Sequence, residues 1–571
     1  MRCLSISAQG NFALHLPLVA LLGAAGVGCG ADDGAAPNDD VGVTRQGVID
    51  TEFGGWNWQF PDAPIQATHV LLMSNDKILA IGGSQANCYY YWGVTSGYFY
   101  DAAPGSSGSW TAISGQPPYA GAYDAFCAGH AHDGNEGAVF SGGLTGYGNQ
   151  NGIGIARGSR YYWGPNSWTQ LGNSPQRYYP TLAGSQFGTV YNFAGAQWNG
   201  SIWQLGLGAA SWSDTGNAHM TTGTYPRVHL LPNGKWFFAS PKGPWDGGDR
   251  KNYYWNPGTS PGPGDIAGTN AMPTDNGVRT YDDWRGTSVL LPIEPVNGAY
   301  PAGKVLIVGG LTSYIKDLSS GNPDWAPVTR TSDGPAQGAE VQFPVRRHNA
   351  QATILPTGEV FVSGGAWDQH SEAATKVVNP EIYGNGADLV NWNSRLAKKA
   401  NYSRNYHSVA VLMRDGRIFT TSGNVDALGS DCDGAWFADG NSNGLPDRRN
   451  RAVEIFSPWY VTHPNRPVIT SCSANMFSNG VNQTVNIGNG EGNLITKVAI
   501  LKAGSITHNF DSDQRLVFLD KVSSTSSTVT YKTPYSHNAA PYGSYMLFVY
   551  KTVSWGGYNR LLPSVGCWTL R

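Results

Sequence analysis

Tyr406 and His407 are neighbours in the sequence, immediately before an apolar run, and both side chains can bind a metal ion. On a regular strand two adjacent side chains point to opposite faces of the sheet, whereas in a loop both can reach one ion. The pair therefore indicates either a metal site in a loop or a buried tyrosine beside a histidine that satisfies backbone groups. Histidines also precede other apolar runs, at His69, His229 and His348, so His407 by itself does not indicate a metal site.

Three other segments carry candidate side chains, and each has an ordinary structural role as its alternative. His508 lies in GSITHN, which taken alone predicts a histidine in an exposed turn. Tyr179 lies in RYYPT, where it would be an aromatic residue of the core. Cys127 lies in DAFCAGHAHDG and would be a core thiol, or would bind a soft transition metal together with His130 and His132.

These segments stand beside a phrase that recurs along the chain: an apolar run, a polar turn with glycine, a second apolar run and then small residues. Each copy predicts two strands joined by a hairpin, in which glycine adopts a positive φ without steric cost. The copies are at 70–83, 130–143, 182–195, 230–240, 290–310, 354–365 and 412–423. Their spacing of roughly 55 residues is close to the kelch-type repeat of about 50. We therefore predict a seven-bladed kelch-type β-propeller over residues 53–463, in which neighbouring sheets protect one another's edges.

The sequence pattern changes after Pro467. Short runs alternate apolar and polar residues without the glycine hairpin, at 495–501, 515–519, 527–531 and 545–549. This pattern predicts a separate immunoglobulin-like β-sandwich over residues 464–571. Cys472 would lie in its first strand and Cys567 in its last, and a disulfide between them would cross-link the two ends of the domain.

The composition excludes several classes of protein. The 571 residues carry 37 Lys and Arg against 40 Asp and Glu, so the net charge of −3 indicates no nucleic-acid partner and no attraction to an anionic membrane. Charged residues make up only 13%, and 29 Tyr, 20 Trp and 19 Phe can bury a large core, which excludes an intrinsically disordered chain. No GxGxxG motif follows a strand and opens a helix, so no nicotinamide or flavin site is indicated.

The N-terminal residues predict export. Arg2 precedes an apolar run over residues 12–27, which is short for a spanning helix and fits a secretory signal. The residues GVGC resemble a bacterial lipoprotein cleavage site, so we expect a lipoprotein-type signal peptide over 1–28 and an acidic tether over 29–52. The protein would be extracellular or a cell-envelope lipoprotein, held to a membrane only through a lipid on Cys29. Ordinary signal cleavage nearby is the alternative.

Taken together, the four segments resemble the copper radical oxidases, the family of galactose oxidase and glyoxal oxidase, over residues 65–571. RNYHSVAVLMRDGRIF is similar to the family's Tyr-His motif and implies Tyr406 as the axial copper ligand and His407 as an equatorial ligand. SITHNFDSDQRLVFL is similar to the C-terminal histidine motif and implies His508 as the second imidazole. RYYPT implies Tyr179 as the redox-active tyrosine, and YDAFCAGHAHDG implies that Cys127 is joined to it by a thioether.

The resemblance implies a secreted enzyme that oxidises a primary alcohol or aldehyde with O₂ to the carbonyl product and H₂O₂. One copper ion would be the metal cofactor, the Tyr179–Cys127 thioether would hold the radical, and Tyr406 would accept the substrate's hydroxyl proton. The expected substrate is a small alcohol, an aldehyde or a carbohydrate. The alternative is a non-catalytic kelch-type module that binds carbohydrate or protein, with its many Trp and Tyr side chains stacked on sugars.

The family also shields its radical with a tryptophan. Trp198 follows the third hairpin, where galactose oxidase carries this residue, and Trp284 and Trp325 are the alternatives from later repeats.

A thioether at Cys127 would also account for the cysteine count, because five cysteines follow the signal region and five cannot all pair. It would leave an even set at positions 88, 432, 472 and 567. Galactose oxidase carries two cysteines after its Tyr-His hairpin, whereas Cys432 stands alone there, so a Cys88–Cys432 bridge would fasten the first blade to the last. Only the predicted tether precedes the propeller, in place of a carbohydrate-binding domain, so galactose specificity is not expected.

One loop has the spacing of a calcium site. Asp439, Asn441, Asn443 and Asp447 place oxygen atoms at positions 1, 3, 5 and 9, with Gly444 at position 6. Calcium is therefore a second predicted metal, with an exposed Asn/Gly turn as the alternative.

Overall fold

The computed structural model describes residues 53–82, 96–114, 124–144, 154–195, 201–216, 223–240, 251–257, 267–271, 286–320, 324–330, 344–367, 376–386, 390–423 and 451–571. The elements that lie wholly within them are β-strands and two short 3₁₀ segments, Leu318–Ser320 and Gly492–Leu494, so the predicted all-β class is confirmed. Over the same ranges, no helix has the length and apolar character needed to cross a bilayer. The predicted signal and tether lie outside the described residues.

Each predicted hairpin supplies two neighbouring strands of an antiparallel sheet among the described residues; six of these sheets have four strands, and the first is extended from four strands to six by two strands from the C-terminal part of the chain. The first sheet holds β2 (His69–Leu72), β3 (Lys77–Gly82), β4 (Ser96–Asp101) and β5 (Trp110–Ala112). The second holds β6 (Asp124–His132), β7 (Gly137–Leu144), β8 (Gly158–Tyr162) and β9 (Ser167–Leu171). The third holds β10 (Thr181–Gly184), β11 (Val190–Phe193), β12 (Trp203–Leu205) and β13 (Ser213–Asp214).

The later sheets repeat this order. The fourth holds β14 (Arg227–Leu230), β15 (Trp236–Ser240), β16 (Lys251–Trp255) and β17 (Ala267–Ala271). The fifth holds β18 (Thr287–Leu290), β19 (Lys304–Val308), β20 (Ser313–Asp317) and β21 (Ala326–Val328). The sixth holds β22 (Gln351–Ile354), β23 (Val360–Ser363), β24 (Glu381–Tyr383) and β25 (Ser394–Leu396). The last holds β26 (Ser408–Leu412), β27 (Ile418–Ser422), β28 (Glu454–Pro458) and β1 (Gly54–Asn57).

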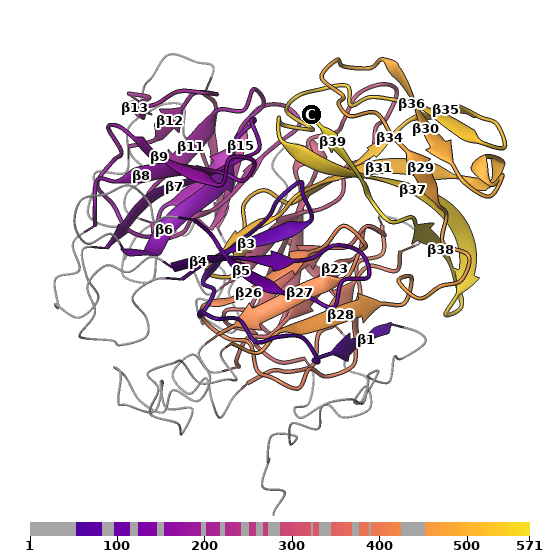
Figure 1. The fold of residues 1–571 in the computed structure, drawn as a ribbon, viewed down its shortest axis with the longest axis horizontal. Helices are drawn as coiled ribbons and strands as arrows, with labels where there is room; N and C mark the ends of the chain where they lie inside the picture. The colour runs from indigo at the N-terminus through magenta and orange to yellow at the C-terminus, as the bar shows by residue number, and fades with distance from the viewer. Residues whose placement is uncertain are drawn as a thin grey trace, which may run out of the picture. The chain divides into compact units, whose positions relative to one another are not determined.

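The first strands of these sheets contact one another in chain order, from β2 through β6, β10, β14, β18 and β22 to β26, and β26 contacts β2 again. The sheets therefore stand around one closed ring, as the blades of a propeller do. The last blade takes its outer strand from the other end of the chain, because β1 pairs antiparallel with β28 (Figure 1). The ring cannot open without breaking this pairing.

Glycines at the ends of the hairpins let a following segment come close to the hairpin backbone. Gly142 has a φ of 81°, and a Cβ atom there would lie 2.5 Å from the carbonyl oxygen of Arg177. Gly364 has a φ of 68°, and a Cβ atom there would lie 2.1 Å from the carbonyl oxygen of Arg404. A side chain at either position would push away a segment that carries one of the candidate tyrosines.

The C-terminal strands form two further antiparallel sheets. One holds β29 (Ile469–Ser471), β30 (Asn482–Ile487), β35 (Lys521–Ser524) and β36 (Thr528–Lys532). The other holds β31 (Lys497–Lys502), β34 (Arg515–Leu519), β37 (Ser544–Trp555), β38 (Tyr558–Pro563) and β39 (Cys567–Leu570). Val485 and Val529 of the first sheet share one core with Ile500 and Leu547 of the second, as in a β-sandwich. A disulfide joins Cys472 to Cys567 across this part.

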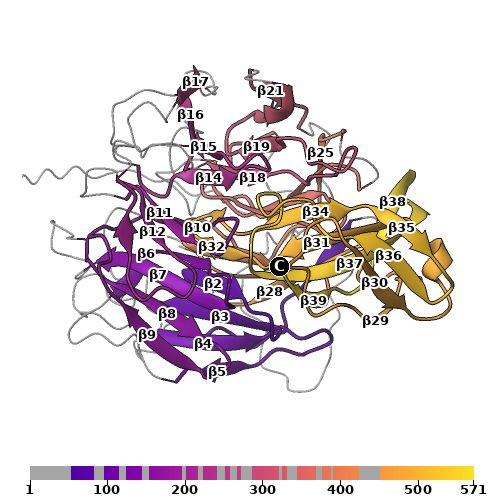
Figure 2. The same ribbon diagram turned by 90° about the horizontal axis from the view of Figure 1, so that it is seen from above.

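Two short strands leave the sandwich and join the propeller. β32 (Ser505–Thr507) and β33 (Phe510–Asp511) form a hairpin, and β32 pairs antiparallel with β2 of the first blade (Figure 2). β32 also contacts β6 and β26, the first strands of the two adjacent blades. The hairpin therefore lies within the ring of first strands, and its tip carries His508.

Candidate metal centre

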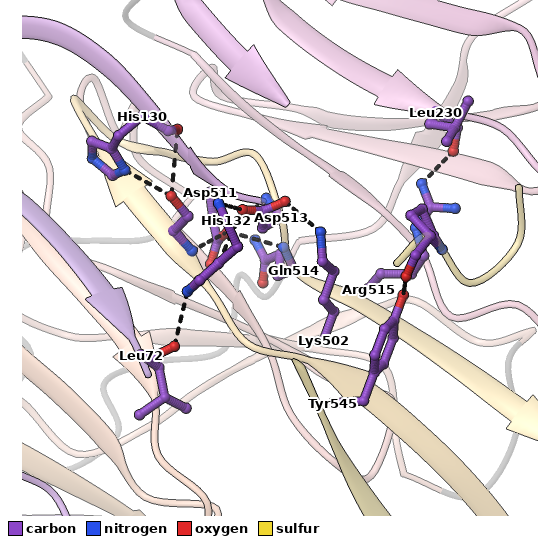
Figure 3. A network of polar contacts seen from close by, with 12 residues as sticks. Leu72, His130, His132, Leu230, Lys502, Asp511, Asp513, Gln514, Arg515 and Tyr545 are labelled. Carbon is purple, nitrogen blue, oxygen red and sulfur yellow. Dashed lines mark hydrogen bonds and ion pairs between the residues drawn. The ribbon is translucent and has the colours of Figure 1, made fainter. Parts of the chain in front are cut away.

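A buried polar network holds the β32–β33 hairpin in the ring (Figure 3). Asp513 accepts hydrogen bonds from the backbone N–H of His132 at 2.7 Å and from Nζ of Lys502 at 2.6 Å. Asp511 accepts one from the backbone N–H of Ser505 at 2.9 Å. Burial acts to raise the pKa of Asp513, but Lys502 and then His132 outweigh it and hold that pKa well below its ordinary value. Asp513 is therefore an ionised link between the sandwich, the hairpin and β6.

Tyr406 and His407 lie in the loop just before β26 and not on the strand itself. Their side chains are therefore not forced to opposite faces of a sheet. His407 has a φ of 67°, a left-handed conformation that costs a bulky residue about 1–3 kcal/mol. The turn of the chain brings the two rings together, with centroids 3.7 Å apart. The buried guanidinium of Arg404 fixes the loop by donating to the carbonyl oxygens of Ser422 at 3.3 Å and Ala452 at 2.8 Å.

Tyr179 also stands just before a first strand and has a positive φ, of 58°. Its backbone N–H donates to the carbonyl oxygen of Cys127 at 2.8 Å. Cys127 is buried and packs with Leu144 against the rings of Tyr178 and Tyr179. The sulfur is therefore in the same small cluster as the ring to which it was predicted to bond.

His508 comes from the sandwich side and meets both tyrosine segments. Its ring centroid lies 4.9 Å from that of His407, 5.3 Å from that of Tyr179 and 5.6 Å from that of Tyr406. The phenol oxygens of Tyr179 and Tyr406 are 3.3 Å apart. Both histidines are buried, and both tyrosines are partly exposed. Two imidazoles and two phenols from three distant segments thus converge, with solvent contact on the tyrosine side.

The surroundings keep His508 neutral. Burial, and after it the neighbouring His407, lowers the pKa of His508 well below its ordinary value. Its Nδ1 lies 2.7 Å from Oγ1 of Thr507, and a proton on Nδ1 that is donated there leaves the lone pair on Nε2 for a metal. Arg227 holds the turn, since its guanidinium donates to the carbonyl oxygen of His508 at 3.2 Å and to Oδ1 of Asn509 at 2.8 Å.

The alternative site at Cys127, His130 and His132 is not assembled. Nδ1 of His132 lies 3.1 Å from Asp513 and its Nε2 lies 2.9 Å from a backbone carbonyl oxygen, while Nδ1 of His130 lies 2.7 Å from Oγ of Ser505. In the part of the chain that the structure describes, no three His, Cys, Asp or Glu side chains are grouped to hold a metal ion. His130 and His132 instead bind the hairpin that carries His508.

Sequence reasoning missed Tyr225, which contacts several parts of this cluster. Its ring stacks on His508 with centroids 4.3 Å apart at an angle of 25°, and lies 4.9 Å from the ring of Tyr179. Burial raises the pKa of Tyr225 well above its ordinary value, so its hydroxyl keeps its proton and donates to the carbonyl oxygen of Ala128 at 3.0 Å. The sequence does carry a signal, because Tyr225, like Tyr179 and Tyr406, stands two residues before the first strand of a blade.

Several predicted positions lie outside the described residues: Trp198, Trp284, Cys29, Cys88, Cys432, and the calcium loop with Asp439, Asn441, Asn443 and Asp447. They remain predictions. Trp325, the other candidate for the shielding tryptophan, packs with Phe237 and Leu290 between the fourth and fifth blades, and its Nε1 donates to Oδ1 of Asn252 at 2.8 Å. It is a core residue of those blades.

Comparison with known proteins finds two family models that match separate parts of the chain. Residues 269–433 match the glyoxal oxidase N-terminus family, and residues 466–566 match the galactose oxidase-like early set domain. Galactose oxidase of Gibberella zeae is 27% identical over 497 residues, which cover 80% of this chain and 64% of that protein. Aldehyde oxidase GLOX of Vitis pseudoreticulata is 28% identical over 368 residues, which cover 60% of this chain and 61% of that protein.

The predicted resemblance to galactose oxidase and glyoxal oxidase is confirmed. A solved structure of a fungal alcohol oxidase of the AA5 family, in complex with copper, superposes with a TM-score of 0.66. It covers 91% of this chain and 99% of its own at 20% identity, so the two proteins share the fold of a propeller joined to a β-sandwich. The chain spans less than two thirds of the galactose oxidase that it matches, 64% of its length.

Proposed function

We propose that the chain is a copper radical oxidase that oxidises a primary alcohol or an aldehyde with O₂ and releases H₂O₂. The observation that carries the proposal is the convergence of two imidazoles and two phenols, with the phenol oxygens 3.3 Å apart and a buried cysteine beside them. The similarity to galactose oxidase and to an aldehyde oxidase supports this activity. Small alcohols, aldehydes and carbohydrates are the proposed substrates.

The donor atoms fit copper(II). Imidazole nitrogen and phenolate oxygen suit the tetragonal N,O sites that this ion prefers, and a neutral His508 can bind it. Tyr179, Tyr406, His407 and His508 would hold the ion, and both tyrosines are partly exposed, so a substrate would approach from their side. A bound copper ion would polarise the substrate oxygen and accept one of the two electrons.

The side chains would carry the proton and the hydrogen atom. Tyr406 would act as the general base and accept the hydroxyl proton of the alcohol. Tyr179, in its oxidised radical form, would take a hydrogen atom from the adjacent carbon. The alcohol thus loses one proton, one hydrogen atom and one further electron, and these equal the two protons and two electrons that convert O₂ into H₂O₂.

The Cys127–Tyr179 thioether is the second part of the proposal. Forming a bond between the sulfur and a ring carbon removes the thiol hydrogen and one ring hydrogen, together two protons and two electrons. O₂ would accept them as H₂O₂. The packing of Cys127 against the Tyr179 ring supports this bond, and a sulfur-substituted ring would be easier to oxidise.

We also infer that the protein is exported. The Cys472–Cys567 disulfide supports an oxidising compartment, where such bonds persist. Lipid attachment at Cys29 would further hold the protein at the cell envelope.

Metal analysis and peroxide detection test the activity. The full chain, loaded with Cu(II) and freed of excess metal, should retain one copper ion per chain and release H₂O₂ with members of a panel of primary alcohols, aldehydes and sugars. His508→Ala should lose the copper, because it removes one of two imidazole ligands. His463→Ala, which alters a partly exposed histidine outside the cluster, should retain it.

The opposite results discriminate the alternatives. Copper that stays bound in His508→Ala would place the metal elsewhere. A wild-type chain without stoichiometric copper and without peroxide release would instead be a kelch-type binding module.

A further inference from the structure

Tyr225 connects to the proposed centre in three different ways. Its backbone N–H donates to the carbonyl oxygen of Tyr179 at 2.6 Å. Its ring is stacked on the imidazole of His508 at 4.3 Å. Its hydroxyl donates to the carbonyl oxygen of Ala128 at 3.0 Å. One buried residue of the fourth blade therefore touches the second blade, the third blade and the hairpin from the sandwich.

These hydrogen bonds form a closed circuit. Tyr225 bonds to Tyr179, the N–H of Tyr179 bonds to the carbonyl oxygen of Cys127 at 2.8 Å, and the next residue, Ala128, receives the Tyr225 hydroxyl. Tyr225 itself is fixed, because a guanidinium nitrogen of Arg227 donates to its carbonyl oxygen at 2.9 Å. The circuit sets how closely the strand that carries Cys127 approaches the segment that carries Tyr179.

We propose that Tyr225 is a positioning residue: its hydroxyl holds Cys127 in reach of the Tyr179 ring, and its ring holds the plane of the His508 imidazole. This inference rests on the proposed copper radical function and specifies which residue prepares it. Thioether formation needs the sulfur and a ring carbon in contact before O₂ removes the two hydrogens, and small misplacements slow such reactions strongly. Tyr225 itself bonds to neither the substrate nor the metal in this proposal.

The test follows thioether formation, which is independent of turnover. Copper-free protein is mixed with Cu(II) in air, then reduced and digested, and mass spectrometry follows the cross-linked pair of peptides that carry Cys127 and Tyr179, which has lost two hydrogens and resists thiol reduction. Tyr225→Phe keeps the stacked ring and removes the bond to Ala128, so bond formation should slow by about fivefold to tenfold. Tyr460→Phe is the matched control, since its buried hydroxyl donates to the carbonyl oxygen of Gly416 at 2.7 Å outside the centre. It should mature at the wild-type rate.

Copper titration separates the role of the ring from that of the hydroxyl. Tyr225→Phe should bind Cu(II) as tightly as wild type, whereas Tyr225→Leu, which loses the stack on His508, should bind about fivefold more weakly. If Tyr225→Leu does not fold, the rate of thioether formation in Tyr225→Phe alone tests the positioning role.

Each outcome has a defined meaning. A wild-type maturation rate in Tyr225→Phe, or an equal slowing in Tyr460→Phe, overturns the positioning role and leaves the proposed function intact. A wild-type chain that neither binds copper nor loses two hydrogens overturns the proposed function and this inference with it.

Discussion

Replacing Asp513 by Asn should destabilise the folded protein by about 3–5 kcal/mol, because it leaves a buried ammonium group without its counterion. Asp513 and Lys502 are only 1% and 2% exposed, and their charged atoms are 2.6 Å apart. The substitution keeps the volume of the side chain and one acceptor for the N–H of His132. The loss of stability therefore measures the effect of removing the negative charge. A loss of this size is a large share of the 5–15 kcal/mol that is typical of a folded domain.

Urea unfolding monitored by tryptophan fluorescence measures this loss. Asp317→Asn is the matched control: the Lys304–Asp317 pair is 3.2 Å apart but 42% and 38% exposed, so its loss should cost under about 1 kcal/mol. Lys502→Met combined with Asp513→Asn should recover part of the stability, since it removes the buried ammonium group and keeps an acceptor for the N–H of His132. Copper affinity of Asp513→Asn should fall as well, because the network holds the hairpin that carries His508. If Asp513→Asn costs no more than Asp317→Asn, the network does not anchor the hairpin.

Two further predictions concern the blades. Burial acts to raise the pKa of Glu381, but two contacting arginines outweigh it and lower that pKa from 4.5 to about 2. A folded-state pKa below the unfolded one stabilises the protein above pH 4.5, here by about 3 kcal/mol, and this stabilisation is lost as the pH falls toward 2. The difference in unfolding free energy between wild type and Glu381→Gln should therefore shrink across that window, and a difference independent of pH would contradict the assignment. Gly142→Ala should destabilise the protein and slow thioether formation, because the added Cβ would meet the carbonyl oxygen of Arg177. Gly105→Ala is the control, since Gly105 also has a positive φ, of 79°, but an added Cβ would meet no atom within 4 Å. It should lower the stability only by the backbone strain, about 1 kcal/mol. Equal stability losses in the two glycine variants, measured by urea unfolding, would argue against the close approach.

The hairpins and the class of fold were predictable because their signals are local. A polar turn with glycine between two apolar runs specifies a hairpin within a short stretch of chain, and every predicted hairpin forms two paired strands of a sheet. The sandwich was recognisable from the change to alternating runs, although β37 extends to Trp555, well past the predicted end at residue 549.

The candidate residues were named from motifs, but their backbone geometry was not foreseen. Tyr179, Tyr225, His407 and His508 all have positive φ, which bulky residues seldom adopt and which only surrounding contacts can enforce. Tyr225 was overlooked because its signal, a place two residues before the first strand of a blade, does not say which side chains its ring contacts. Its role depends on a ring from another domain that stacks on it.

The sequence alone determined which segments become strands, where glycine must permit a tight approach and which side chains can donate to a metal, since each of these depends on residue type and short-range spacing. The tertiary structure alone decided that β32 leaves its own sandwich to pair with β2, and that the hydroxyls of Tyr179 and Tyr406, 227 positions apart, come within 3.3 Å. Contacts across such separations depend on how whole sheets close into a ring, and closure is a property of the packed chain that no short window of sequence contains.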